Sequence, residues 1–193
     1  MIPLLVIRHG KTEWNLQKKL QGRRDIPLCE EGIEELKTAI IPAEFQMFEW
    51  VSSPLQRAIQ TAQILGATDL SIENRLIEMD FGAWEGHTIK ELRNCFGEEM
   101  IENERQGLDM TPPEGESPRL VRERLASFLR ELSSPTIAVT HKGVIRALQS
   151  LAYDWDMKQV LPIEYHWNKA HLFLITEEGH VIPERPNVRL EKP

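Results

Sequence analysis

The sequence of 193 residues predicts an α/β fold in which helices cover a largely parallel sheet. Short apolar runs that end in Gly or polar residues alternate with segments of helical periodicity. Two of these runs, over residues 2–7 and 135–140, have the nearly continuous hydrophobicity of strands buried on both faces. A short hairpin near the C-terminal end would add antiparallel edge strands. We therefore expect a mixed, mostly parallel sheet in a single domain over residues 1–193.

Strands and helices alternate through the first half of the chain. Periodicity places Ile40 on the buried face of the first helix. The second helix has a strong start signal, with Ser53 as N-cap, Pro54 at the first helical position and Gln56 completing a capping box. The predicted elements, in order, are a strand over 2–7, a helix over 30–40, a strand over 48–52, a helix over 54–65 and a short strand over 69–72.

The second half continues the alternation. A helix over 88–106 is expected to break at Gly97, and Leu120 belongs to the apolar side of the clearest amphipathic helix. The tail from Glu184 is Pro-rich and polar, so we expect a surface extension. The other predicted elements are an irregular segment over 73–86, a loop over 112–115, a helix over 117–132, a strand over 135–140, a helix over 143–152 and hairpin strands over 170–176 and 180–183.

The segment from about residue 88 to 118 is distinct in charge and length. Its acidic residues far outnumber its basic ones, which is typical of a solvated helical surface. It is too long for a simple loop between a sheet edge and a helix. We therefore predict a cap-like helical insertion at about 88–118 that covers one end of the sheet.

Composition excludes several classes of function. A net charge of −7 argues against a nucleic-acid partner. No apolar run approaches a membrane span and no signal-peptide pattern opens the chain, so we expect a cytoplasmic protein without a membrane partner. Cys29 and Cys95 are isolated, which predicts inert thiols in a reducing compartment. A monomer and a homodimer both remain open.

The first strand delivers Arg8 and His9 to the position where an α/β protein binds its ligand. Open sheets of this class form their ligand crevice just beyond the carboxyl ends of the strands. Gly10 follows at once and allows a sharp turn. A guanidinium beside an imidazole suits phosphate chemistry, because it sets a planar fork of donors next to a possible nucleophile.

A second strand end repeats this arrangement. His141 follows the apolar strand over 135–140 just as His9 follows the first strand, and a parallel sheet brings both ends to one crevice. Gly143 begins a helix whose N–H groups offer an anion seat. Arg57 lies in the first turn of another helix, where the dipole disfavours a cation, so phosphate binding would account for it.

Three carboxylates are candidates for a general acid. Glu78 lies among apolar and aromatic residues, which can raise the pKa of a carboxyl group as acid catalysis requires. Asp80 and Glu85 lie in the same segment, and composition alone does not choose between the three. Together with His87, these two residues come closest to a metal cluster, but they lack metal-ligand spacing, so we expect no metal.

The order and spacing of these motifs resemble the histidine phosphatase superfamily, in particular its bacterial phosphoglycerate-mutase-like phosphatases. The resemblance runs from Leu4 to about Leu148 and is carried by RHGKTEWN, LQGRRDIPLCEEG, SSPLQRAIQTA, LIEMDFGAWEG, GES and THKGVIRAL. It implies a three-layer phosphoglycerate-mutase-like fold, with a mixed sheet between helices, and it implies no cofactor.

The resemblance also implies a role for each matching residue. His9 would attack phosphorus and become a phosphohistidine, and Glu78 would protonate the leaving oxygen and then activate water. The phosphoryl oxygens would be held by a set of basic residues, with Asn15 close by; these are Arg8, Arg57 and His141. Gln21 and Gly22 would belong to a substrate-side loop. Two arginines and a cationic histidine could then neutralise the three equatorial oxygens without a metal.

Two residues depart from the family pattern. Lys142 stands where glycine usually follows the second histidine, and it adds bulk and charge near the pocket. We hypothesise that Lys142 favours substrates with a second anionic group. Cys29 stands where threonine is common, and we expect it to lie away from the chemistry.

The leading functional prediction is a metal-independent phosphomonoesterase that acts on a small phosphorylated metabolite through a phosphohistidine. A phosphoglycerate mutase, which is a phosphoryl transferase on the same machinery, is the alternative, although the short chain favours hydrolysis. A non-catalytic phospholigand-binding module would usually lack a histidine or the acid, and here all are present. A phosphoprotein phosphatase would need an open groove, against which the predicted cap argues.

Overall fold

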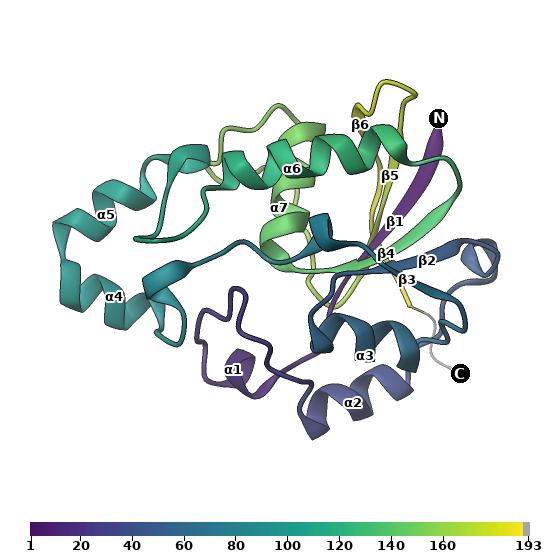
Figure 1. Cartoon of the computed structure of the whole chain (residues 1–193), viewed down its shortest axis with the longest axis horizontal. Helices are drawn as coiled ribbons and strands as arrows, with labels where there is room; N and C mark the ends of the chain where they lie inside the picture. Colours follow the sequence, from purple (N-terminus) through teal and green to yellow (C-terminus); the bar gives the residue numbers. More distant parts are fainter. Residues whose placement is uncertain (191–193) are drawn as a thin grey trace.

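The computed structural model describes residues 1–190 and contains a six-stranded sheet in the order β3-β2-β4-β1-β5-β6 (Figure 1). The four strands on one side pair in parallel, whereas β5 pairs antiparallel with β1 and β6 antiparallel with β5. The predicted mixed, mostly parallel α/β sheet is therefore confirmed. The strands are β1 (Ile2–Arg8), β2 (Glu49–Ser52), β3 (Leu70–Ile72), β4 (Thr136–Thr140), β5 (Ala170–Ile175) and β6 (Val181–Val188).

Helices cover both faces of this sheet and produce two cores. Because successive strand residues point to opposite faces, Leu4 and Val6 pack with α6 and α7, whereas Leu5 and Ile7 pack with α2 and α3. This sandwich is the reason that the central strands read as continuous apolar runs. The helices are α1 (Glu13–Leu16), α2 (Glu30–Lys37), α3 (Gln56–Ile64), α4 (Ile89–Phe96), α5 (Glu98–Glu104), α6 (Pro118–Glu131) and α7 (Lys142–Ala152).

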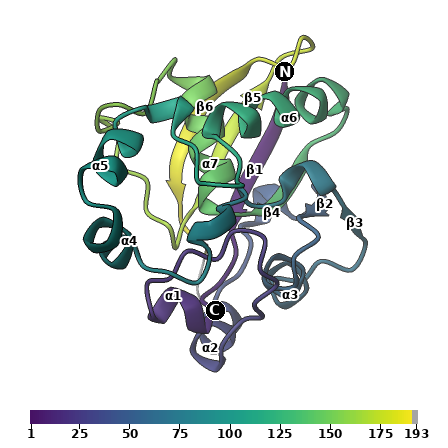
Figure 2. The same ribbon diagram turned by 60° about the vertical axis from the view of Figure 1, so that its left-hand side comes forward.

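The α4–α5 segment is set apart from the sheet (Figures 1 and 2). The two helices meet at Gly97, whose φ of +52° lies in the left-handed region that favours glycine. The predicted helix break at this residue is confirmed. A small separate cluster of Trp84, Leu92 and Met100 anchors the segment through its apolar side.

The predicted start of α3 is wrong. Its N-cap is Leu55, which makes no side-chain capping bond, and no capping box forms. The backbone N–H and side chain of Gln56 instead bond to Asp25, 31 residues away in sequence. Ser53 turns its hydroxyl toward His141. The Ser53 hydroxyl also accepts from the N–H of Leu55 at 3.3 Å, but this turn precedes the helix, which begins only at Gln56.

The predicted polar tail is also wrong. Strand β6 continues to Val188, which is buried and pairs with Ala170. Pro183 and Pro186 are tolerated because β6 is an edge strand, where a missing N–H faces no neighbouring strand, and the pairing shifts register along it. Residues 191–193 of that predicted tail lie outside the described residues.

Three smaller differences concern helix faces and one short helix. Helix α2 ends at Lys37, so Ile40 lies beyond it and is 39% exposed rather than buried. Leu120 in the first turn of α6 is 48% exposed, because the buried face of the helix runs through Val121 and Leu125 and Leu120 lies to one side of it. The short helix α1, capped by Thr12 and Asn15, was not predicted.

Candidate active site

His9 and His141 meet because their strands are neighbours. Strand β1 pairs in parallel with β4, with Arg8 opposite Thr140, so the residues that follow both strands emerge side by side. The two imidazole rings have centroids 5.1 Å apart and planes inclined by 53°. Both rings are buried, His141 completely. Two residues far apart in the sequence thus form one centre.

The His9 ring is held by its own loop. Its Nδ1 lies 2.7 Å from the carbonyl oxygen of Gly10. A carbonyl only accepts, so Nδ1 carries the proton and the lone pair of neutral His9 is on Nε2. Burial, followed by the charges of Arg57 and Arg8, lowers the pKa of His9 well below its ordinary value. His9 is therefore a neutral imidazole with an available nucleophilic nitrogen.

The His141 ring is held from the opposite nitrogen. Its Nε2 lies 2.7 Å from Ser53 Oγ, and its buried Nδ1 has no partner within residues 1–190. Burial, the charge of Arg57 and the proximity of His9 lower the pKa of His141 well below its ordinary value. The cationic histidine expected around a bound phosphoryl group therefore stays a prediction, since burial and the neighbouring cations by themselves oppose protonation of this ring.

Two arginines lie beside the histidine pair without a carboxylate in ion-pair contact among the described residues. Arg57, fully buried on α3, donates from Nη1 to the carbonyl of Arg24 at 2.7 Å and from Nη2 to that of Gly22 at 2.8 Å. The Nε groups of Arg57 and of Arg8 are buried and have no hydrogen-bond partner in the part of the chain that the structure describes. Burial lowers the pKa of both guanidinium groups. These buried, unsatisfied donors favour an anionic ligand.

Glu78 lies against the beginning of α7. Its carboxyl group accepts hydrogen bonds from the backbone N–H of Met79 at 2.8 Å and of Gly143 at 3.2 Å. Burial raises the pKa of Glu78, against the opposing effect of these N–H groups and of Arg57. Gly143 leaves room for the carboxyl group, since a Cβ there would lie 2.4 Å from Glu78 Oε1. The site therefore contains a buried carboxyl with a raised pKa beside His141.

The other two carboxylates of this segment have structural partners instead. Asp80 accepts from the N–H of Gly82 at 2.8 Å, and Glu85 accepts from the N–H of Arg23 at 2.8 Å. The Asp80 bond closes a local turn, and the Glu85 bond ties the loop around Arg23 to the segment that follows Glu78. The geometry thus distinguishes Glu78 from its two rivals.

The remaining predicted site residues surround this centre to different degrees. The amide oxygen of Asn15 accepts from Thr12, and the amide oxygen of Gln21 accepts from the Thr12 hydroxyl at 2.8 Å. Gly22 contacts Arg57 through its carbonyl oxygen. The Nζ of Lys142 lies 5.0 Å from the centre of the Trp167 ring. Thr12 therefore links Asn15 and Gln21, and these bonds order the loop that follows His9.

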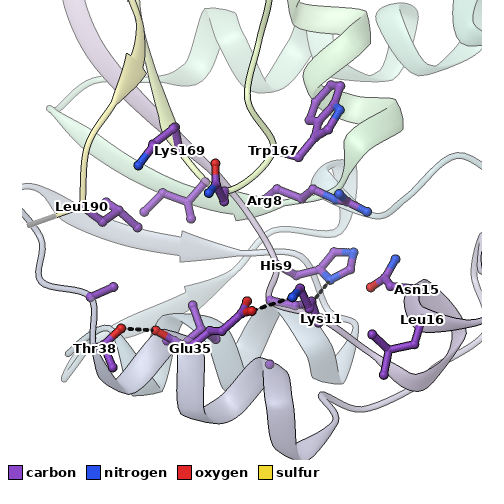
Figure 3. A pocket seen from close by; sticks show the side chains of 16 residues that line it. Arg8, His9, Lys11, Asn15, Leu16, Glu35, Thr38, Trp167, Lys169 and Leu190 are labelled. Atoms are coloured by element: carbon purple, nitrogen blue, oxygen red, sulfur yellow. Dashed lines mark hydrogen bonds and ion pairs between the residues drawn. The ribbon is translucent and has the colours of Figure 1, made fainter. Parts of the chain in front are cut away.

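A cavity of about 600 Å³ opens beside His9 (Figure 3). Arg8, His9 and Asn15 line it together with Trp167, but Arg57, Glu78 and His141 do not. The figure shows Arg8 and His9 at one side of this space, with Lys169 and Leu190 at the other. The cavity is therefore an opening next to the histidine pair rather than the space between the two rings.

Sequence reasoning missed Ser53 and Trp167 as parts of this site. Ser53 follows β2 directly, so the criterion that identified His9 and His141, a polar residue just beyond a parallel strand, could have found it. Trp167 precedes β5, whose antiparallel direction brings its beginning to the end of β1. No local signal marks that placement.

Two kinds of feature are absent from the described residues 1–190. No group of three or more His, Cys, Asp or Glu side chains there could hold a metal ion. No helix in the same residues has the length and apolar character needed to span a membrane.

Comparisons with known proteins agree with this geometry. A family model described as "Histidine phosphatase superfamily (branch 1)" matches residues 4–185. A protein named 2,3-bisphosphoglycerate-dependent phosphoglycerate mutase, from Parvibaculum lavamentivorans, is 31% identical over 93% of this chain and 93% of its own length.

Two solved structures share the fold. A phosphoserine phosphatase from Entamoeba histolytica, in complex with 3-phosphoglyceric acid, aligns with a TM-score of 0.80 at 28% identity over 97% of each chain. A structure called mycobacterial hydrolase 1 has a TM-score of 0.82 at 24% identity, covering 97% of this chain and 99% of its own, which shows the common fold alone.

Proposed function

Because the chain belongs to the histidine phosphatase superfamily, we propose that it is a metal-independent phosphomonoesterase that acts on a small phosphorylated metabolite through a phosphohistidine. One observation carries the proposal: the neutral His9 ring, with Nδ1 held by Gly10, lies beside two buried guanidinium groups that lack a carboxylate in ion-pair contact within residues 1–190. Such a pocket favours a phosphate dianion and offers a nucleophile for it.

In the first half-reaction, His9 Nε2 attacks phosphorus. An N–P bond forms while the bond from phosphorus to the ester oxygen breaks, and Glu78 donates its proton to that oxygen. The raised pKa of Glu78 supports this role, because the carboxyl group must be protonated when the alcohol leaves. Arg8, Arg57 and His141 hold the phosphoryl oxygens, so charge neutralisation and positioning supply most of the catalysis.

In the second half-reaction, Glu78 as a carboxylate takes a proton from water. The water oxygen attacks phosphorus, the N–P bond breaks, and inorganic phosphate leaves while Glu78 is again protonated. Entry of the dianion would also raise the pKa of His141, since its charge opposes the cationic surroundings that now keep that ring neutral. We propose that Asn15, Gln21 and Gly22 line the substrate side, and that residues 88–118 cap it.

The experiment is an assay of phosphate release from a panel of phosphomonoesters in the presence of a chelator, with His9→Ala as the matched variant. We expect release from a few esters, indifference to the chelator, and loss in His9→Ala. Rapid quenching followed by mass spectrometry should place an acid-labile phosphoryl group on His9. Full activity of His9→Ala would refute the mechanism.

Phosphoglycerate mutase activity is the second candidate, because the relative from Parvibaculum lavamentivorans carries that name. A mutase must return the phosphoryl group to a glycerate hydroxyl before water reaches it. Interconversion of phosphoglycerates without release of phosphate would favour this candidate. Binding of phosphate or vanadate without any turnover would instead indicate a non-catalytic module.

A further inference from the structure

Two cations share one indole ring at the edge of the phosphate site. Lys142 Nζ lies 5.0 Å from the centre of the Trp167 ring, and Arg8 Cζ lies 5.9 Å from the same centre. Figure 3 shows Trp167 next to the side chain of Arg8. Both distances are within the range of cation–π attraction, so Trp167 orients the two side chains toward one region.

A third cation continues this arrangement along α7. Arg146 follows Lys142 by one helical turn, and its Cζ lies 4.9 Å from the centre of the Trp155 ring. Among residues 1–190, none of the three cations forms an ion pair, whereas Arg75 and Arg124 on the same side of the sheet do. The charge of these three groups is therefore unneutralised, although the protein as a whole is acidic.

This arrangement is unfavourable without a ligand. Lys142 is the first residue of α7, where the helix dipole disfavours a cation, and Arg146 adds a like charge at i+4. Desolvation, followed by the charges of Arg8 and Arg146, lowers the pKa of Lys142. An anion placed near Lys142 would relieve all of these effects together.

The position of Lys142 relates it to the leaving group. The N–H of its neighbour Gly143 donates to Glu78, the proposed proton donor, at 3.2 Å. The leaving oxygen must approach that carboxyl group when it takes the proton. The remainder of a substrate attached to this oxygen therefore leaves past the beginning of α7, where the Lys142 side chain is exposed to solvent.

We propose that Lys142, held by Trp167, binds a second anionic group on the leaving alcohol, so that the preferred substrates are short phosphomonoesters that also carry a carboxylate or a second phosphate. The inference rests on the proposed function for the position of the phosphoryl group. Lys142 acts as a specificity-determining residue, and Trp167 as a positioning residue.

The test compares two esters that differ in one group. 3-Phosphoglycerate has a carboxylate where glycerol 3-phosphate has a hydroxymethyl group. Their dissociation constants are measured by calorimetry in His9→Ala, which cannot turn them over. We expect this protein to prefer 3-phosphoglycerate about tenfold, as one charge-assisted contact supplies. Lys142→Met, introduced into the His9→Ala protein, should remove most of this preference. Lys142→Arg in the same protein should keep it, because the positive charge remains.

Arg130→Met is the matched control. It removes one exposed cation from the last turn of α6, near the beginning of β4 and so at the opposite end of the strands. This variant should keep the preference. Trp167→Leu should reduce it about threefold, because the ring only orients Lys142.

Absence of a preference in the starting protein, or an unchanged preference after Lys142→Met, would overturn the inference. A mutation that weakens binding of the phosphoryl group itself should change both dissociation constants equally and leave their ratio unchanged. The ester affinities test the Lys142 subsite, whereas phosphate release tests the proposed function. If both esters bind with the expected preference but phosphate is released from neither, the subsite is supported and the proposed function is refuted, so the two failures are distinguishable.

Discussion

The rings of His9 and His141, 5.1 Å apart, are held through opposite nitrogens. His9 uses Nδ1 to bond its own loop, and His141 uses Nε2 to bond Ser53. Each ring thus keeps one nitrogen without a protein partner in the described residues. A phosphoryl group between them could receive the lone pair of one ring and a hydrogen bond from the other. Several measurements follow from this arrangement.

Replacing Ser53 by Ala should release the His141 ring. The hydroxyl makes the only described hydrogen bond to that imidazole, at 2.7 Å, so its loss frees the ring to rotate. We expect kcat/KM to fall about tenfold, as the loss of one buried hydrogen bond predicts. Steady-state kinetics with a single ester measures this.

Ser52→Ala is the matched control, because Ser52 is equally buried and its Oγ donates to the carbonyl of Ser53 at 2.9 Å. Both variants should lose about 1 kcal/mol of unfolding free energy. Activity in Ser52→Ala should stay within about twofold. Equal loss of activity in the two variants would argue that Ser53 has only a structural role.

Replacing Gly143 by Ala should displace the acid rather than the backbone. The new methyl group would lie 2.4 Å from Glu78 Oε1 and 3.2 Å from Met79 Cβ, and the carboxyl group is the end of a flexible side chain. We expect about a 100-fold loss of kcat for an alkyl phosphate and a much smaller loss for 4-nitrophenyl phosphate, whose leaving group needs no proton.

Glu78→Gln should reproduce the same dependence on the leaving group, and thermal unfolding of Gly143→Ala should shift by only a few degrees. An equal loss of activity for both esters would show that the methyl group disturbs binding of the phosphoryl group and not proton donation by Glu78.

Arg57→Lys should uncouple the loop around Gly22 from the proposed phosphate site. One guanidinium group now bridges the carbonyls of Gly22 and Arg24, and a lysine ammonium cannot match this fork. We expect kcat/KM to fall at least 100-fold. Hydrogen exchange of residues 20–25 should also become faster in this variant. The control Arg130→Lys should change neither kcat/KM nor this exchange rate. An unchanged exchange rate in Arg57→Lys would contradict the coupling.

The buried histidines should make stability depend on pH. Folding lowers the pKa of His141 well below the value of about 6.5 that it has when unfolded. As pH falls below 6.5, the unfolded chain therefore binds more protons than the folded protein, and unfolding free energy declines by up to about 1.4 kcal/mol per pH unit for each such histidine.

Urea unfolding between pH 7.5 and 5 measures this slope. It should be flatter in His141→Asn than in the unaltered protein. Glu78, whose pKa is raised, contributes in the opposite direction, since the folded protein holds its proton more tightly, but it is present in both proteins. Equal slopes would show that His141 is protonated in the folded protein.

Sequence alone could predict the elements whose signals are local. The apolar runs of β1 and β4 must be buried on both faces, which predicts a parallel sheet and the meeting of the residues that follow each strand. The break of the helical segment at Gly97 is likewise a local signal. The capping box at Ser53 looked as clear and failed, because the Gln56 side chain that would complete it bonds to Asp25, which is 31 residues away in sequence.

The α/β class, the strand ends that carry Arg8, His9 and His141, and the family of these motifs all followed from the order of the residues. Which nitrogen of each ring makes a hydrogen bond, and that Trp167 lies near Lys142, became visible only in the folded chain. Hydrophobic periodicity depends on residues that are close together in the sequence. Hydrogen-bond partners and burial, which set the pKa values, arise only when distant segments pack together.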